Sequence, residues 1–343
     1  MKIKYSNLFK INVRSEDYVK ISISIFFACI YAYFLSSLSN DIFRDRGNYI
    51  VYARNFDSIG RGNSLISSLV NEPIFLFYNE LLSYIFVQET VPKVGVFIIA
   101  FTLSYFIFKY SKNILLAIFG LLLLFFVSYT FHLQLVVLRQ GIATALLIWI
   151  VYLFWGKRIF YPLTFLLSFF HVSFFIVFFV LFYDYILSKY ITNIKLRLFL
   201  ITITTFLGSF FLLRIALGLG VRQAESSHLQ INENSGGGFI LFSFLLIFLF
   251  FRGFNNVYSD RYGRVATLGL IAYLALYFTI PVSGRLIGTF LPFFYIYIVS
   301  CRSSKVIFAA VIFLIVNIYL YYGSITGGSL TLEGVRYLDN ILF

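Results

Sequence analysis

Long apolar segments alternate with short polar ones along most of the chain. Segments 113–130, 196–220 and 305–322 are examples, and each is close to the ~20 residues that a helix needs to cross a bilayer core of ~30 Å. A helix satisfies its own backbone hydrogen bonds, which lipid cannot do for it. The pattern therefore predicts a bundle of membrane-spanning helices.

Two segments depart from this pattern. Segment 72–88 is apolar but begins with Glu72, and segment 158–184 has basic loops at both ends and His171 near its middle. We interpret the first as an interfacial or re-entrant helix that enters and leaves on the outer side of the membrane. The second is interpreted as two short helices that meet near the outer face at 170–173.

With these two hairpins about nine full crossings remain; if either is an ordinary span, the downstream charge pattern inverts or the count rises to about ten or eleven. We therefore predict an all-α, polytopic membrane protein of about nine to eleven helices, with 1–343 as a single transmembrane domain. The first apolar run is too long for a signal-peptide core and lacks a cleavage pattern, so it is retained as a span. The nine predicted crossings are 19–39, 93–109, 113–130, 139–156, 196–219, 239–252, 264–280, 285–301 and 305–322.

Composition supports this class. Hydrophobic residues make up 60% of the chain and charged residues only 12%, against roughly 25% charged residues in a soluble domain. Mean hydropathy is +0.90. Cys29 and Cys301 both fall inside predicted crossings, so we interpret them as packing residues and expect neither a disulfide framework nor a cysteine metal site.

The net charge of +13 does not indicate a nucleic-acid partner, because the basic residues are spread over short loops. Basic residues favour cytoplasmic loops, and this rule explains most of them. It places the N-terminus, 1–18, in the cytoplasm. The other basic clusters on that side are Lys109 and Lys112; Lys157 and Arg158; Lys189, Lys195 and Arg197; Arg252, Arg261 and Arg264; and Arg302 and Lys305.

A second set of arginines falls on the outer side, against the rule. This side holds the predicted periplasmic loops 40–72 and 220–238 and the periplasmic C-terminus 323–343. These arginines need a reason other than topology. They are Arg44, Arg46, Arg54, Arg61, Arg139, Arg222, Arg285 and Arg336.

Arg139 and Arg285 each open a predicted crossing. A charge at the centre of a membrane helix costs on the order of 2.5–3.5 kcal/mol or more and usually marks function. The structural alternative is that each side chain reaches lipid phosphate or pairs with an acid. Arginine donates several hydrogen bonds to phosphate oxygens and stays charged. A pyrophosphate head group at the outer face, with its lipid tail in the bilayer, would match this placement.

Short motifs in a fixed order carry a family resemblance. Segment 44–52 reads RDRGNYIVY, 72–75 reads EPIF, 138–143 reads LRQGIA and 170–173 reads FHVS, and a Gly-Arg pair at 284–285 follows later. In this order they resemble the EpsG family of exopolysaccharide polymerases, relatives of the Wzy-type O-antigen polymerases.

The resemblance implies a GT-C-like glycosyltransferase in the bacterial inner membrane, with its active site facing the periplasm. Such an enzyme transfers a growing glycan from undecaprenyl pyrophosphate onto the terminal sugar of a lipid-linked repeat unit. The implied partners are this lipid-linked oligosaccharide, membrane lipid and a polysaccharide chain-length regulator, and no nucleic acid. We expect no cofactor and no metal, since no Asp-X-Asp triplet occurs and arginine can stabilise the departing pyrophosphate.

Roles follow by analogy with that reaction. The candidate bases are Asp45, Glu72 and His171. Their structural alternatives are pairing of Asp45 with Arg44 or Arg46, a helix-dipole role for Glu72 and a core position for His171. We expect the pyrophosphate to bind Arg139, Arg285, Arg46 and Arg44, with Arg222 and Arg336 on a lid, and the glycan to bind Tyr49, Tyr52 and Gln140.

Two other functions share much of this chemistry. An O-antigen ligase would use the same arginines and the same lipid donor, and only the motif order favours the polymerase. A flippase or transporter of lipid-linked oligosaccharide would also need a cationic cavity, but near the membrane midplane, whereas these charges gather at the outer end.

Overall fold

The computed structural model describes residues 15–43, 45–54, 72–218, 236–250, 253–279, 283–301 and 303–326. Within these residues the regular structure is helical and no β-strand occurs, which confirms the all-α class. The first half contains α1 (Ser15–Ser37), η1 (Asn40–Ile42), α2 (Arg46–Arg54), α5 (Pro73–Ser83), η2 (Gln88–Thr90), α6 (Val91–Tyr110), α7 (Ile114–Phe126), α8 (Ser128–Leu135) and α9 (Leu138–Phe154). The second half contains α10 (Phe160–Leu166), η3 (Leu167–Phe169), α11 (Phe174–Tyr190), α12 (Ile194–Gly218), α14 (Gly237–Phe250), α15 (Phe254–Ser259), α16 (Arg261–Leu276), α17 (Ser283–Ser300) and α18 (Ser304–Thr326).

Several of these helices can cross a membrane. In the described residues, four helices are long and apolar enough, lying in α1, α6, α12 and α17, and a bent pair formed by α7 and α8 makes a fifth if it is counted as one span. Shorter apolar helices include α9, α14 and much of α18. The chain is therefore a membrane protein, and its full count of nine to eleven crossings stays a prediction.

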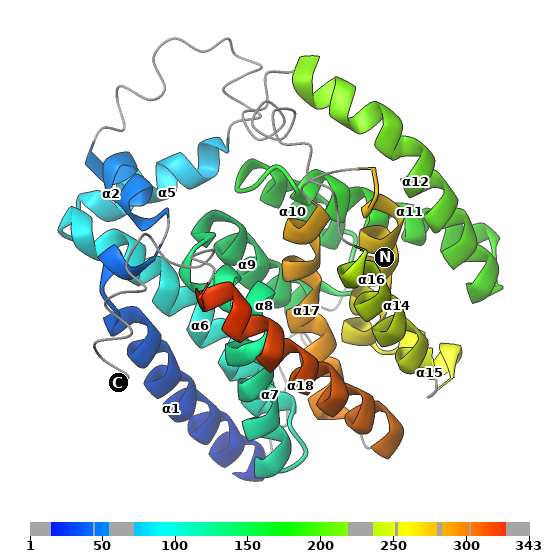
Figure 1. Cartoon of the computed structure of the whole chain (residues 1–343), viewed down its shortest axis with the longest axis horizontal. Coiled ribbons are helices and arrows are strands. Elements are labelled where there is room, and N and C mark those ends of the chain that lie inside the picture. The colour runs from blue at the N-terminus through cyan, green and yellow to red at the C-terminus, as the bar shows by residue number, and fades with distance from the viewer. Residues whose placement is uncertain are drawn as a thin grey trace, which may run out of the picture.

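The outer helices and the inner helices differ in exposure. Figure 1 shows α1 and α12 on opposite sides of the bundle, with α6, α9 and α17 between them. On α1, large apolar side chains such as Phe26 and Tyr33 are exposed, whereas α6 and α17 are mostly enclosed. Apolar side chains on the outside of a bundle suit contact with lipid tails, so α1 and α12 fit a lipid-facing position.

The predicted crossing 113–130 is not one straight helix. It bends by 75° between α7 and α8. The bend is stabilised because the Thr130 hydroxyl donates to the carbonyl oxygens of Leu123 and Val127, at 3.2 and 3.0 Å, and the Gln134 amide donates to that of Leu124 at 3.0 Å. These bonds join α8 to the last turn of α7, where the bend interrupts the regular backbone hydrogen bonds of the helix. The sequence pattern shows the apolar run but not this break.

The two irregular segments contain helices where the sequence predicted them. Segment 158–184 divides at 170–173, because η3 ends at Phe169 and α11 begins at Phe174. Segment 72–88 contains α5, which packs on α2. Figure 1 shows α2 and α5 beyond one end of α1. Both features bring polar residues to the same end of the bundle, where the candidate site lies.

Candidate active site

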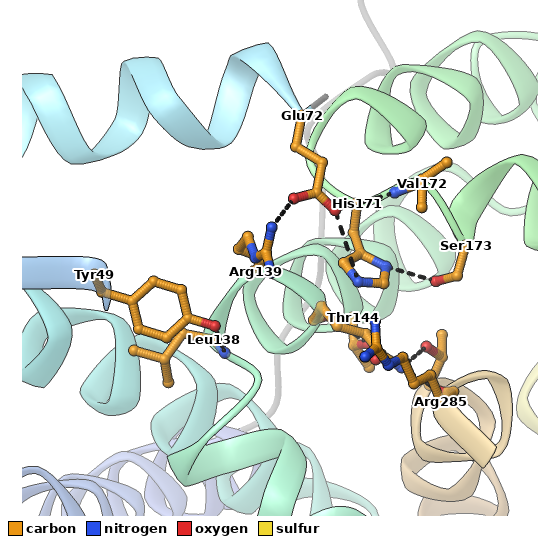
Figure 2. A network of polar contacts seen from close by, with 11 residues as sticks. Tyr49, Glu72, Leu138, Arg139, Thr144, His171, Val172, Ser173 and Arg285 are labelled. Carbon is orange, nitrogen blue, oxygen red and sulfur yellow. Dashed lines mark hydrogen bonds and ion pairs between the residues drawn. The ribbon is translucent and has the colours of Figure 1, made fainter. Parts of the chain in front are cut away.

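Four helices begin close together, and each carries a polar side chain in its first turn or just before it. Glu72 precedes α5, Arg139 is the second residue of α9, His171 lies shortly before α11, and Arg285 is the third residue of α17. Figure 2 shows these residues gathered in one place. The N-terminal end of a helix carries a partial positive charge and unpaired N–H groups. Four such ends at one place favour an anion.

The carboxylate of Glu72 is the centre of the cluster. The side chain is buried and forms an ion pair with the guanidinium of Arg139. The backbone N–H of Val172 donates to its Oε1 atom at 3.4 Å. Because these partners come from α9 and from the turn before α11, Glu72 joins three parts of the chain that are far apart in sequence.

His171 is fully buried beside this carboxylate. Its Nε2 atom lies 3.7 Å from Oε1 of Glu72, and its Nδ1 atom lies 2.7 Å from the Ser173 hydroxyl (Figure 2). Burial, together with the positive charges of Arg139 and Arg285, holds the pKa of His171 well below its usual range. The imidazole is therefore neutral at physiological pH and can exchange a proton with a neighbouring oxygen.

The two arginines differ in their surroundings. The side chain of Arg139 is 26% exposed, and its Nε atom is buried without a hydrogen-bond partner among the described residues. Arg285 is exposed, and its guanidinium forms no hydrogen bond or ion pair with the part of the chain that the structure describes. The charges of Arg139 and Glu72 act on Arg285, so it lies near both. The cluster thus has one paired arginine and one that is available to a ligand.

Gln140, the residue after Arg139, connects α9 with α17. Its Nε2 atom donates to the carbonyl oxygen of Arg285 and to the Thr289 hydroxyl, the latter at 2.8 Å. The Gln140 side chain is buried, so its position fits a role in joining the two helices better than the expected contact with a glycan.

Two residues of α2 also serve as supports. The hydroxyl of Tyr49 accepts a hydrogen bond from the N–H of Leu138 at 3.2 Å, which fixes the first turn of α9 next to Arg139 (Figure 2). Tyr49 is buried, and burial raises its pKa to about 12. The ring of Tyr52, which is partly exposed, packs edge-on against Tyr49 with 6.2 Å between the centroids.

Arg46 has a position that differs from the one expected for a pyrophosphate ligand. The side chain is fully buried, and its guanidinium donates to the carbonyl oxygens of Leu135 and Leu38, at 3.0 and 3.3 Å, and to the Asn40 side chain. It also lies over the Phe43 ring. Burial lowers its pKa to about 10, so it remains charged at neutral pH. Arg46 therefore anchors α2 to α8 in this structure.

Asp45 lies just before α2 and is partly exposed. Its backbone has a φ of 70°, in the left-handed region, and its carbonyl oxygen accepts hydrogen bonds from the N–H groups of Asn48 and Tyr49 at 3.0 and 3.3 Å. The charge of Asp45 acts on both Tyr49 and Arg285. Asp45 is thus near the cluster without being joined to Glu72.

The remaining predicted residues lie outside the described part of the chain. They are Arg44, Arg222 and Arg336. Ser173 and Thr289 carry no signal of a role of their own in the sequence, and only their contacts with His171 and Gln140 place them here. Among the described residues, no three His, Cys, Asp or Glu side chains are grouped closely enough to hold a metal ion.

Comparison with known proteins identifies the family. No curated protein and no solved structure matches the chain. The model of the EpsG family matches residues 23–331, which is most of the chain and includes all four helix ends of the cluster. The resemblance found in the sequence motifs is thereby confirmed, and the protein belongs to the EpsG family.

Proposed function

We propose that this protein polymerises a surface polysaccharide at the periplasmic face of the bacterial inner membrane. The donor is a glycan on undecaprenyl pyrophosphate, and the acceptor is the terminal sugar hydroxyl of a second lipid-linked repeat unit. The hydroxyl oxygen attacks the anomeric carbon of the donor. The bond from that carbon to the pyrophosphate oxygen breaks, and the lipid pyrophosphate leaves with the electron pair.

The convergence of four helix N-termini with Arg139 and Arg285 is the observation that supports this proposal most strongly. The leaving pyrophosphate gains negative charge as the bond breaks. Fixed positive groups at the place where charge develops are usually the largest contribution to such a step. Arg285 is available to the phosphate oxygens because no described residue pairs with its guanidinium.

The ion pair between Glu72 and Arg139 suggests how the base becomes available. A pyrophosphate that binds Arg139 competes with Glu72 for the guanidinium. When the phosphate takes over these hydrogen bonds, the buried carboxylate of Glu72 loses its counter-ion and becomes a stronger base. The acceptor hydroxyl then gives its proton to Glu72, either directly or through the neutral imidazole of His171, whose Nε2 atom is 3.7 Å away.

The support residues keep these groups in register. We propose that Tyr49 holds the first turn of α9, that Arg46 holds α2 against the end of α8, and that Gln140 holds the first turn of α17, as their hydrogen bonds indicate. Tyr52 and Asp45 are partly exposed and remain candidates for contact with the glycan and for a second base, respectively. Catalysis depends strongly on such positioning, because misplacement of a group by ~1 Å can cost on the order of a hundredfold in rate.

The glycan profile of the source strain tests the function. We expect that deletion of the gene leaves a single repeat unit on the lipid core and no ladder, and that the wild-type gene restores the ladder. Loss of surface glycan with accumulation of lipid-linked polymer would instead indicate a ligase. An unchanged ladder would contradict both functions.

A reconstituted reaction tests the donor. The purified protein with a synthetic repeat unit on polyprenyl pyrophosphate should form polymer and release polyprenyl pyrophosphate in equal amount to the linkages made. The same repeat unit on polyprenyl monophosphate is the control and should give no polymer. Equal activity on both carriers would contradict the proposed role of the pyrophosphate.

A further inference from the structure

A pocket with basic and aromatic walls lies far from the candidate active site. Its volume is about 140 Å³, and its lining includes the basic residues Lys157, Arg158 and Arg264 together with the aromatic residues Trp155 and Tyr161. We call it the basic pocket. None of these residues takes part in the reaction proposed above.

The basic pocket is at the opposite end of the bundle from the Glu72 cluster. Arg139 is at the start of α9, and the pocket begins at Trp155, just after the last residue of α9. At 1.5 Å per residue this helix is about 25 Å long, which is close to the thickness of the apolar core of a bilayer. A similar relation holds along α11, because His171 precedes its first turn and Asp184 in its last half lines the pocket. The pocket therefore lies near the other membrane surface.

The pocket has an excess of positive charge. Its carboxylate, Asp184, is buried and already accepts hydrogen bonds from the Tyr258 hydroxyl and from Arg264, with Nε at 2.7 Å. Arg197 adds a longer ion pair to the same carboxylate at 3.9 Å. Asp184 is thus neutralised by its own partners and has little charge left to offset the remaining cations.

Those remaining cations are exposed at the mouth of the pocket. Lys157 and Arg158 form no ion pair with any acid in the described part of the chain, and the Lys157 ammonium lies 5.4 Å from the centroid of the Phe154 ring. In the absence of a ligand these two cations interact mainly with solvent. An anion bound in the pocket would add an electrostatic attraction to both. Phosphate is the anion that Lys and Arg bind most often in such sites.

An aromatic strip leads from the pocket along the surface of the bundle. The ring of Tyr161, in the pocket wall, contacts Phe182 at 5.5 Å between centroids, Phe182 stacks on Phe178 at 5.3 Å, and Phe178 meets Phe165 at 5.1 Å. Phe165 and Phe182 are exposed. A ligand whose phosphate occupies the pocket could therefore lay a hydrocarbon chain along this strip. A free phosphate ion would make no use of it.

We propose that the basic pocket binds the phosphate of an acidic phospholipid, with an acyl chain on the aromatic strip. Basic pockets between membrane helices are known to bind anionic head groups, and Lys and Arg side chains near an anionic membrane surface add to the attraction. The bound lipid would join α10 and α11 to α16, on the far side of the membrane from the site of glycan transfer.

Lipid titration of the purified full chain, followed by native mass spectrometry, tests this proposal. We expect phosphatidylglycerol to bind at least tenfold more tightly than phosphatidylcholine. The double variant Lys157→Ala/Arg158→Ala should weaken phosphatidylglycerol binding about thirtyfold, which corresponds to about 2 kcal/mol at 1.4 kcal/mol per factor of ten. Its phosphatidylcholine binding should not change.

A matched double variant controls for general charge loss. Lys112 and Lys305 are exposed basic residues at the same end of the bundle, because Lys112 contacts the end of α17 through the Val299 carbonyl oxygen and Lys305 is in the first turn of α18. Lys112→Ala/Lys305→Ala should leave phosphatidylglycerol binding unchanged. Equal weakening by both double variants would overturn the proposal, since it would indicate a diffuse surface effect.

Two further measurements separate the sources of phosphate. Inorganic phosphate at millimolar concentration should not displace phosphatidylglycerol, and displacement would mean that the pocket takes free phosphate. A photoreactive phosphatidylglycerol with its reactive group in the acyl chain should label peptides from α10 and α11 in the wild-type protein. Labelling confined to other helices would overturn the proposed position of the acyl chain. This result needs only the wild-type protein.

Discussion

Asp45 and Glu72 share a left-handed backbone conformation, with φ of 70° and 64°, although each begins a different segment of the site. No other non-glycine residue in the described chain has a positive φ. Such conformations cost on the order of 1–3 kcal/mol for a residue with a side chain, and they persist where surrounding structure holds them. Both residues were predicted as candidate bases by analogy with the reaction that the family resemblance implies.

Substitution of Glu72 by glycine or by alanine separates the cost of this backbone from the role of the carboxylate. Both variants should lose polymer, because both lack the acid. Glu72→Gly should nevertheless be more stable than Glu72→Ala, with a free energy of unfolding about 1 kcal/mol larger and a higher unfolding temperature. The reason is that glycine adopts positive φ without strain. Thermal unfolding in detergent measures the difference, and equal stability of the two variants would argue against the left-handed conformation.

Removal of the unpaired arginine gives the cleanest test of pyrophosphate binding. Arg285→Ala should reduce polymer formation by about a hundredfold or more, because loss of one group that stabilises developing charge typically costs ~10²–10³ in rate. The protein should still insert, since the side chain is exposed and unpaired among the described residues. Arg54→Ala is the matched control, because Arg54 forms an exposed ion pair with Glu89 and should be dispensable. Full activity of Arg285→Ala would remove this residue from the mechanism.

Loss of Arg139 should have a different signature. Its ion pair with Glu72 is largely buried, so Arg139→Gln leaves a carboxylate without a counter-ion. We expect lower stability as well as lost polymer, and partial recovery of stability, but not of polymer, in the double variant Glu72→Gln/Arg139→Gln. Simple additivity of the two stability changes would show that the residues do not interact.

The neutral state of His171 predicts how stability depends on pH. The folded chain holds the pKa of this residue well below the unfolded value near 6.5. Below that pH the unfolded chain therefore binds one more proton than the folded chain, and the free energy of unfolding should fall by up to ~1.4 kcal/mol per pH unit. Above pH 6.5 the contribution is fully present. The decline in the unfolding temperature between pH 7 and 5 should be smaller in His171→Gln, and an identical decline would contradict the prediction.

A pair of glycines tests the packing behind the site. A Cβ atom on Gly141 would lie 2.5 Å from the carbonyl oxygen of Leu133, a backbone atom that cannot easily move, whereas one on Gly208 would meet nothing within 4 Å. Gly141→Ala should therefore reduce both the yield of folded protein and polymer formation. Gly208→Ala should be tolerated, since alanine favours a helix more than glycine does. Equal tolerance of both would argue against the close approach of α9 and α8.

Cysteine labelling in intact cells tests the predicted orientation. Gly47 in α2 and Tyr84 directly after α5 are exposed on two helices that pack together at the outer end of the bundle, while Arg158 and Lys305 are exposed at the other end. Cysteines at the first two positions should react with a membrane-impermeant reagent added from the periplasm, and those at the last two should not. The reverse result would place the candidate site in the cytoplasm and overturn the proposed function.

The sequence allowed the all-α class and the identity of the main cluster to be predicted. Arg139 and Arg285 stood out because charged residues in apolar sequence are rare, Glu72 and His171 stood out through the family motifs, and the structure places the four together. The pattern could not show which arginines are free. Arg46, like Arg139, is an arginine within a family motif. Its guanidinium, however, donates to the backbone carbonyl oxygens of Leu135 in α8 and of Leu38, directly after α1. That difference depends on how remote helices pack.

The interruption between α7 and α8 could not be predicted for a related reason. Segment 113–130 is apolar throughout its first part. Its hydropathy indicates the length of an apolar segment but not whether the helix axis changes direction within it. At the break, Thr130 and Gln134 donate side-chain hydrogen bonds to buried carbonyl groups in the last turn of α7. The basic pocket was missed because Lys157, Arg158 and Arg264 are well explained by the preference of cytoplasmic loops for basic residues.

The two hydrogen bonds that Gln140 makes to α17 have a consequence for the choice of carrier lipid. They set the separation of Arg139 and Arg285 before any ligand arrives, so the protein presents two cations at a spacing of its own. A diphosphate can engage both at once, whereas a monophosphate can bind only one of them and leaves the other without a phosphate partner. We expect this spacing to favour a carrier with two phosphates over a carrier with one. The protein would then distinguish the two carriers by the distance between their phosphates and not only by their total charge.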